Sequence, residues 1–244
     1  MIYQRGTIDS YQQWADAVGD QSWSWNNILP YFKKSVDFTP PNPKRASNAS
    51  AEYLASAFDA TGGPLEVSYA NYAQTFSSYM EGSLNEIGIP TRDDFNSGQL
   101  FGAQYCSSTI SPGDGKRQSS QTSFLNAAAS ARNLKVYTES VGEKIILDDQ
   151  KRATGVKVST AGVHYVLSVK REVIVSAGAF QSPQVLMLSG IGPKEQLEKF
   201  GIPVVADRPG VGQNLTDHIF FGPAYRVSVE TFTKLANVSF PLMI

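Results

Sequence analysis

The most regular alternation of hydrophobic and polar positions lies between residues 134 and 175. Short runs rich in β-branched residues are separated there by Gly155 and by the pair Ala161-Gly162. Such runs predict strands joined by short turns, which together form a β-meander. The five predicted strands span residues 134–138, 143–147, 153–158, 164–169 and 172–175.

Apolar residues earlier in the chain recur at helical spacing, and proline and glycine mark the breaks between the segments. The predicted helical segments are 7–34, 76–87 with a stop at Gly88, and the alanine-rich 123–131. Two further strands are predicted at 64–69 and 104–110. A proline-rich polar loop is predicted over 36–50.

The segment from residue 173 to residue 193 has the most specific pattern in the chain. Val173 to Val175 predicts a buried strand, and the small residues from Ser176 to Ala179 would let a bulky group approach the backbone. Ser182-Pro183 predicts an N-cap and first helical turn, followed by a helix from Gln184 that Gly190 ends. Periodicity alone also allows an ordinary strand-to-helix connection.

Composition narrows the class of protein. The chain has 244 residues, 41% of them hydrophobic, and a formal net charge of −1. These values indicate a globular core and no strong field that would attract nucleic acid or an anionic membrane. No apolar stretch reaches the roughly 18 residues of a membrane span. Cys106 is the only cysteine, which excludes an internal disulfide, and with two histidines no metal cluster is expected.

The sequences of several segments resemble motifs of the glucose-methanol-choline (GMC) family of FAD-dependent oxidoreductases. Residues 178–192 resemble the second signature of that family, and Met1 to Gly6 resembles the tail of its flavin-proximal Asn-x-Met-x-Tyr-x-Arg-Gly motif. Val211-Gly212-Gln213-Asn214-Leu215-Thr216-Asp217-His218 resembles its later Val-Gly-x-Asn-Leu-x-Asp-His run. The resemblance covers nearly the whole chain.

The resemblance implies an α/β fold with FAD as cofactor. We expect a Rossmann-like FAD-binding lobe with an inserted β-meander and part of a substrate-binding lobe, and thus an incomplete GMC fold. The expected division is 1–45 in the FAD-binding region, 46–100 in the substrate-binding lobe, 101–200 in the FAD-binding lobe and 201–244 in the substrate-binding lobe. Cytoplasmic and secreted locations both stay open.

Family members are more than twice this length, and residue 1 falls inside the first motif. We therefore expect an internal fragment or a truncated product, with the FAD-seating G-x-G-x-x-G upstream and the catalytic His beyond residue 244. No residue of this chain is assigned a catalytic role. We expect the chain alone to be inactive and to hold no stoichiometric FAD.

Two motifs inside the chain could suggest other chemistry. The run from Gly210 to Leu215 follows a strand-like segment, but Leu215 replaces the third glycine of a dinucleotide turn. Asp217 and His218 are adjacent, so in an extended run their side chains point in opposite directions and cannot form a relay with each other. We interpret Asn214, Asp217 and His218 as structural hydrogen-bonding residues.

The resemblance implies a small set of cofactor-binding residues. Ile2 stands where the first motif passes the flavin, and Ala177 and Gly178 have the small size needed beside the cofactor. A family valine that meets the adenine through its backbone corresponds to either Val141 or Gly142, and both stay open.

Three functions remain as hypotheses. The first is FAD-dependent oxidation of a small-molecule alcohol, with an aromatic or polyketide alcohol of a fungal natural-product pathway as the expected substrate. The second is a non-redox lyase or cyclase reaction on the same scaffold. The third is an inactive truncated product.

Overall fold

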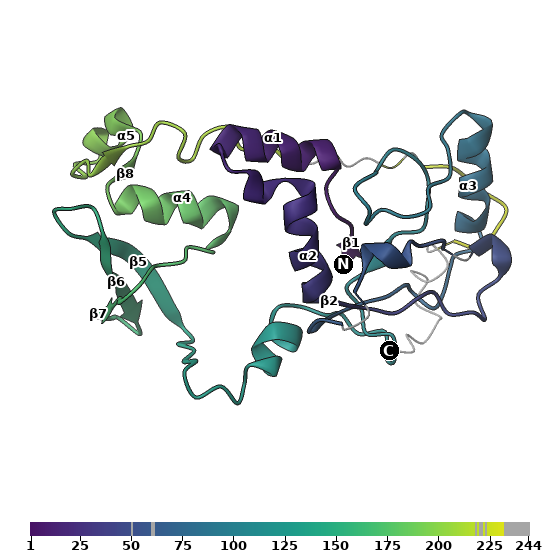
Figure 1. The fold of residues 1–244 in the computed structure, drawn as a ribbon, viewed down its shortest axis with the longest axis horizontal. Coiled ribbons are helices and arrows are strands. Elements are labelled where there is room, and N and C mark those ends of the chain that lie inside the picture. Colours follow the sequence, from purple (N-terminus) through teal and green to yellow (C-terminus); the bar gives the residue numbers. More distant parts are fainter. Residues whose placement is uncertain (50, 60–61, 218, 220–221, 223, 232–244) are drawn as a thin grey trace. The chain divides into compact units, whose positions relative to one another are not determined.

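A computed structural model describes residues 1–49, 51–59, 62–217, 219, 222 and 224–231. The chain divides into two compact units (Figure 1). Unit 1 contains Met1–Leu134 and the described chain from Ala224 onward, and unit 2 is Lys135–Pro223. Among the described residues, no helix is both long enough and apolar enough to cross a membrane.

A helical segment follows the first strand of unit 1. It consists of α1 (Ile8–Val18), the 3₁₀ turn η1 (Gln21–Trp23) and α2 (Trp25–Ser35), which confirms the helical prediction over 7–34. The side chain of Thr7 caps α1 by accepting a hydrogen bond from Ser10 N at 3.1 Å. Gly19 then ends the helix in the left-handed region, at φ 66°.

The strands of unit 1 are short. Strand β1 (Ile2–Tyr3) pairs antiparallel with β4 (Ser107–Ser108), and β2 (Val36–Phe38) pairs parallel with β3 (Leu65–Val67). The strand predicted at 64–69 is confirmed, but the strand predicted over 104–110 is reduced to two residues. The loop predicted over 36–50 is wrong at its start, because Val36 to Phe38 find a hydrogen-bonding partner in β3.

Further helical turns complete unit 1. Helix α3 (Ser77–Glu86) confirms the helix predicted over 76–87, and Gly88 follows it at φ 87°. The predicted alanine-rich helix is shorter than expected and contains a π-helical turn, η4 (Gln121–Leu125). The 3₁₀ turns η2 (Ser47–Ala49) and η3 (Ala55–Ala57) lie between β2 and β3.

The core of unit 1 forms around the β2–β3 pair. Val36, Ala57, Phe58 and Val67 are its buried members, and the rings of Phe38 and Phe58 stack with centroids 3.8 Å apart. Arg5 is buried beside this core, 2% exposed, and its guanidinium donates to the main-chain oxygens of Ala57 and Asn96. The Arg5 of the first motif therefore joins chain segments that are far apart in sequence.

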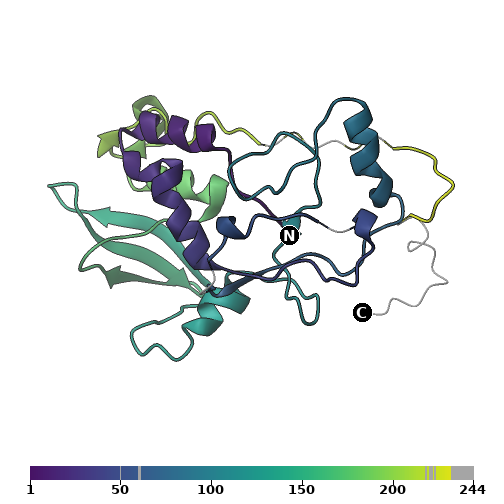
Figure 2. The same ribbon diagram turned by 45° about the vertical axis from the view of Figure 1, so that its right-hand side comes forward.

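Unit 2 contains the β-meander. It has β5 (Ser140–Leu147), β6 (Ala153–Thr160) and β7 (Val163–Ser168) in the order β5-β6-β7, all antiparallel (Figure 2). These confirm the three central predicted strands. The strands predicted at 134–138 and 172–175 are wrong, because neither segment pairs with any described strand.

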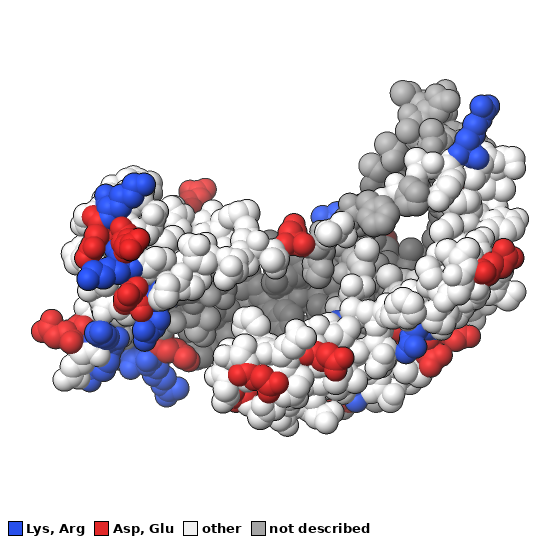
Figure 3. All heavy atoms as spheres, turned by 90° about the horizontal axis from the view of Figure 1, so that it is seen from above, with Lys and Arg blue, Asp and Glu red and all other residues white. Residues whose placement is uncertain are grey.

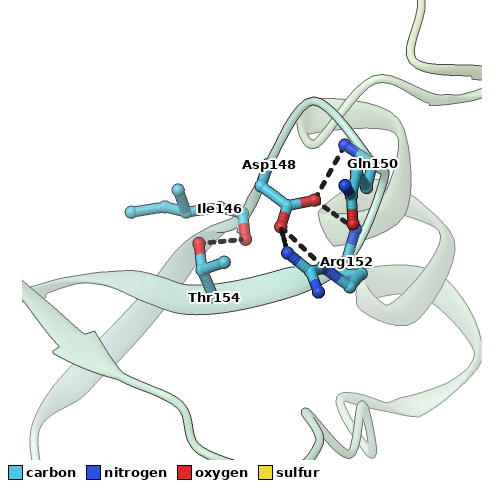
Figure 4. A network of polar contacts seen from close by, with 5 residues as sticks. All are labelled: Ile146, Asp148, Gln150, Arg152 and Thr154. Carbon is cyan, nitrogen blue, oxygen red and sulfur yellow. Dashed lines mark hydrogen bonds and ion pairs between the residues drawn. The ribbon is translucent and has the colours of Figure 1, made fainter.

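The β5–β6 hairpin is closed by one carboxylate (Figure 4). Asp148 accepts hydrogen bonds from the backbone N–H groups of Gln150 and Arg152, both at 2.9 Å, and from Arg152 Nε at 2.8 Å. The backbone N–H of Arg152 is the main reason that the pKa of Asp148 lies below its ordinary value. The carboxylate thus fixes the turn that sets the register of the two strands.

The rest of unit 2 alternates helices and short strands. It contains α4 (Gly178–Leu188), β8 (Ile191–Gly192), α5 (Lys194–Lys199) and β9 (Ala206–Asp207), and β8 and β9 pair in parallel. The predicted helix start at Ser182-Pro183 is wrong, because Pro183 lies inside α4. Ser182 instead reaches back and accepts a hydrogen bond from Ala177 N at 3.1 Å.

Charged side chains of both signs are mixed on unit 2. Glu143 of β5 pairs with Lys157 of β6 at 3.2 Å and with His164 Nδ1 of β7 at 3.0 Å. Figure 3 shows basic and acidic residues side by side at its left end, where the meander and α5 lie in Figure 1. At this end, basic and acidic side chains are interspersed.

Candidate functional site

The N-terminal end of α4 is open. Gly178 is its first residue and has φ 86°, a conformation that residues with a Cβ rarely adopt. A Cβ placed on Gly178 would meet no described atom within 4 Å outside the neighbouring chain and its own helix. The N–H groups of a helix's first turn have no partner inside the helix, and in α4 no side chain caps them. This end of α4 can therefore receive an electron-rich group.

The Val211–Leu215 segment lies against the same helix. A Cβ on Gly212 would stand 3.5 Å from Met187 Cε and 3.6 Å from Pro183 Cβ. The two segments line an open groove of about 450 Å³, with the ring of Phe180 on the α4 side and Leu215 opposite. Two motifs that the sequence analysis treated separately are thus brought together in one place.

Ser189 connects α4 to the meander. Its Oγ donates to Val185 O at 2.6 Å and accepts from Ile145 N at 2.8 Å. Ser189 is only 2% exposed and Ile145 only 6%. The bond fixes the end of α4 on β5, and so holds the helix at a set place beside the strand that contains Val141 and Gly142.

Four of the five predicted cofactor-binding residues lie in unit 2. Ala177 and Gly178 are exposed at the start of α4, and Val141 and Gly142 are exposed in β5, with Val141 63% exposed. Because β5 is an outer strand of the meander, the main-chain groups on its outer edge have no strand partner in the sheet. Ile2 lies in β1 of unit 1 and is 67% exposed. The roles of all five residues stay predictions.

Sequence reasoning missed two residues that shape this site. Gly190 was interpreted only as a helix stop, but a Cβ there would stand 2.5 Å from Pro203 O. Ser189 was not singled out, because a serine before a glycine at a helix end is unremarkable in sequence. Their importance comes from contacts with Pro203 and Ile145, which are distant in the chain.

The structural role predicted for Asn214, Asp217 and His218 stays a prediction. Asn214 adopts a left-handed conformation at φ 53°, Asp217 is exposed, and His218 lies outside the described residues. Within the described part of the chain, no group of three His, Cys, Asp or Glu could hold a metal ion. Burial raises the pKa of the Cys106 thiol, which favours its unreactive protonated form.

Comparison with known proteins identifies the chain. The model of the GMC oxidoreductase family matches residues 1–220. The chain belongs to the GMC oxidoreductase family. Patulin synthase of Aspergillus clavatus is 47% identical over 98% of this chain and 38% of its own length. The chain thus spans less than two fifths of the length of this GMC relative.

Solved structures of GMC-type proteins show the same fold. An FAD-dependent oxidoreductase from Chaetomium thermophilum matches 86% of this chain and 36% of its own, with a TM-score of 0.81 at 33% identity. A fungal aryl-alcohol oxidase matches with the same TM-score at 25% identity. The expected incomplete GMC fold and FAD as the cofactor of the family are confirmed.

The described residues fit FAD at two places in unit 2. At the start of α4, a Cβ on Gly178 would meet no described atom within 4 Å outside the adjoining chain and helix, so a bulky group could approach there, and no side chain caps the first turn. At the outer edge of β5, Val141 or Gly142 can offer main-chain hydrogen bonds to an adenine edge. Both places require main-chain contacts and small side chains rather than charged groups.

Proposed function

We propose that the complete polypeptide containing this chain is an FAD-dependent oxidoreductase that oxidises a small-molecule alcohol. An aromatic or polyketide alcohol of a fungal natural-product pathway is the proposed substrate. The main support is that the Val211–Leu215 segment packs against Pro183 and Met187 of the α4 signature and lines an open groove together with that helix. The fungal relatives add to this support.

The residues of this chain would bind and orient the cofactor. When bound, FAD supplies the site that accepts a hydride from the alcohol carbon. The first turn of α4 would donate N–H groups to the cofactor, and the absence of side chains at Gly178 would let it approach closely. The Ser189–Ile145 hydrogen bond would hold the C-terminal end of α4 on β5, and so keep the helix at a fixed spacing from the β5 edge.

Absorbance spectroscopy on the purified complete polypeptide tests this proposal. We expect flavin bands at close to one FAD per chain, and bleaching of these bands when an aromatic alcohol is added without oxygen. Bound flavin that no alcohol reduces, together with conversion of a substrate without net oxidation, would favour the lyase or cyclase alternative. A complete polypeptide without flavin would favour the inactive alternative.

A further inference from the structure

A second pocket lies in unit 1, between α3 and the chain from Phe95 to Tyr105. Its volume is about 360 Å³. The helix side of the pocket is formed by Ser77, Met80, Glu81 and Leu84. These residues are three or four positions apart, so they share one face of α3. A single helix face therefore provides one whole wall.

The opposite wall is held in place by main-chain bonds. Ala103 N donates to Pro90 O at 2.8 Å, and Arg92 N donates to Ala103 O at 3.0 Å. Gly102 adopts φ 146°, and a Cβ there would stand 2.3 Å from Arg92 Cγ. Gln104 Nε2 also donates to Arg92 O, at 2.7 Å. The wall is thus a closely packed loop with little room to collapse inward.

The pocket is mainly apolar, with a few polar groups at defined places. Met80, Leu84, Phe95 and Ala103 supply hydrocarbon and thioether surface. Engineered apolar cavities of about 150 Å³ bind benzene, so about 360 Å³ holds one aromatic ring with a substituent. A large apolar pocket with few convergent polar groups is the usual form of a small-molecule site.

Glu81 gives the pocket its chemical selectivity. Its Oε1 accepts a hydrogen bond from Thr91 Oγ1 at 2.7 Å, and Thr91 Oγ1 in turn accepts from Asn85 Nδ2 at 2.9 Å. Among the described residues, no donor reaches Glu81 Oε2, and Glu81 forms no ion pair. One oxygen of an oriented carboxylate is therefore left to accept from a ligand.

From this geometry, we infer that the α3 pocket binds a single-ring aromatic compound whose hydroxyl group donates to Glu81 Oε2. The ring lies against Met80, Leu84 and Phe95, and the carboxylate fixes the orientation of the hydroxyl. The inference deepens the proposed function, on which it rests for the choice of an alcohol as ligand.

The test compares benzyl alcohol with toluene, which has the ring but no hydroxyl donor. Ligand-observed NMR titrations are carried out on the complete polypeptide and on three variants. E81Q keeps the shape of the side chain and removes its charge, and E86Q is the matched control on an exposed part of α3. Leu84→Trp fills the pocket, and circular dichroism checks that each variant is folded.

We expect E81Q to weaken benzyl alcohol binding at least tenfold and to leave toluene binding unchanged within twofold, because hydrogen bonds to charged groups are strong. We expect E86Q to change neither and Leu84→Trp to remove one binding site per chain for both compounds. No benzyl alcohol binding, equal effects of E81Q and E86Q, or an unchanged number of binding sites per chain in Leu84→Trp would overturn the inference. These results do not depend on flavin content. If the flavin of the polypeptide is reduced by alcohols but benzyl alcohol binding is insensitive to these variants, only the α3 pocket is refuted. Benzyl alcohol binding as expected in a polypeptide without flavin would instead refute the proposed function.

Discussion

The Oγ of Ser189 accepts a hydrogen bond from the backbone N–H of Ile145 at 2.8 Å. The bond is buried and joins the end of α4 to the middle of β5. Val141 and Gly142 lie on β5, and Ala177 and Gly178 lie at the start of α4, so this bond links the elements that hold these four predicted cofactor contacts. Through this bond, the meander can contribute main-chain contacts of β5 to a cofactor site.

Ser189→Ala should destabilise the protein, because it leaves the buried N–H of Ile145 without a partner. We expect a loss of about 1 to 3 kcal/mol in the free energy of unfolding. Urea denaturation of the native polypeptide and the variant measures it. Ser168→Ala, at an exposed position of β7, should change stability by less than about 0.5 kcal/mol. Equal losses in the free energy of unfolding for the two substitutions would show that the bond does not stabilise the fold.

Gly190→Ala should be more damaging than Gly201→Ala. Both glycines have positive φ, 83° and 65°, so alanine strains the backbone at either position. Only at Gly190 would the new Cβ meet a backbone oxygen, that of Pro203, at 2.5 Å. A Cβ on Gly201 would meet no described atom within 4 Å beyond the adjoining chain.

Thermal unfolding of the two glycine variants separates backbone strain from steric overlap. Gly201→Ala should cost about 1 kcal/mol. Gly190→Ala should cost a further 1 to 3 kcal/mol or so, because the β8 region must shift to relieve the overlap. Similar melting temperatures for the two variants would contradict the close approach of Gly190 to Pro203.

Periodicity predicted those elements whose stability is mostly local. For some segments, the element that the local sequence favours is also the element in the fold. These are the helical segment over 7–34, the helix ending before Gly88 and the three central strands of the meander. The runs at 134–138 and 172–175 have similar composition but form no strand. A strand requires a hydrogen-bonded neighbour, which composition cannot reveal.

The candidate site was predictable in its motifs but not in its geometry. The small residues at Ala177-Gly178 were recognised from their size. The start of α4 was misplaced because Ser182 has the composition of an N-cap, whereas its hydroxyl reaches back to Ala177 N. The approach of Val211–Leu215 to Pro183 and Met187 depends on tertiary packing and left no signal in the local pattern.

Tyr69 should make stability depend on alkaline pH. Burial, reinforced by the carboxylate of Asp94 and the thiol of Cys106, raises the pKa of its phenol above the ordinary value. A raised pKa in the folded state gives a contribution to stability that is complete below the ordinary pKa of about 10 and is lost as the pH rises further.

We therefore expect Tyr69→Phe to reduce the fall in melting temperature between pH 8 and pH 11. The matched control is Tyr72→Phe, because Tyr72 is 66% exposed. In this control, the melting temperature should fall between pH 8 and pH 11 by as much as in the native protein. Melting curves by circular dichroism at the two pH values give the comparison. An unchanged fall in Tyr69→Phe would contradict the assigned role of the buried phenol.

The central claim is that the open end of α4 binds FAD, and flavin occupancy in two matched glycine variants tests it most directly. Gly178 and Gly162 have φ values of 86° and 82°, and a Cβ at either position would meet no described atom within 4 Å beyond the adjoining chain. Valine should therefore impose similar backbone strain, about 1 to 3 kcal/mol, at both. In the complete polypeptide, the ratio of flavin to protein absorbance should fall severalfold in Gly178→Val and stay at the native value in Gly162→Val. Native occupancy in Gly178→Val, or an equal loss in both variants, would contradict the claim.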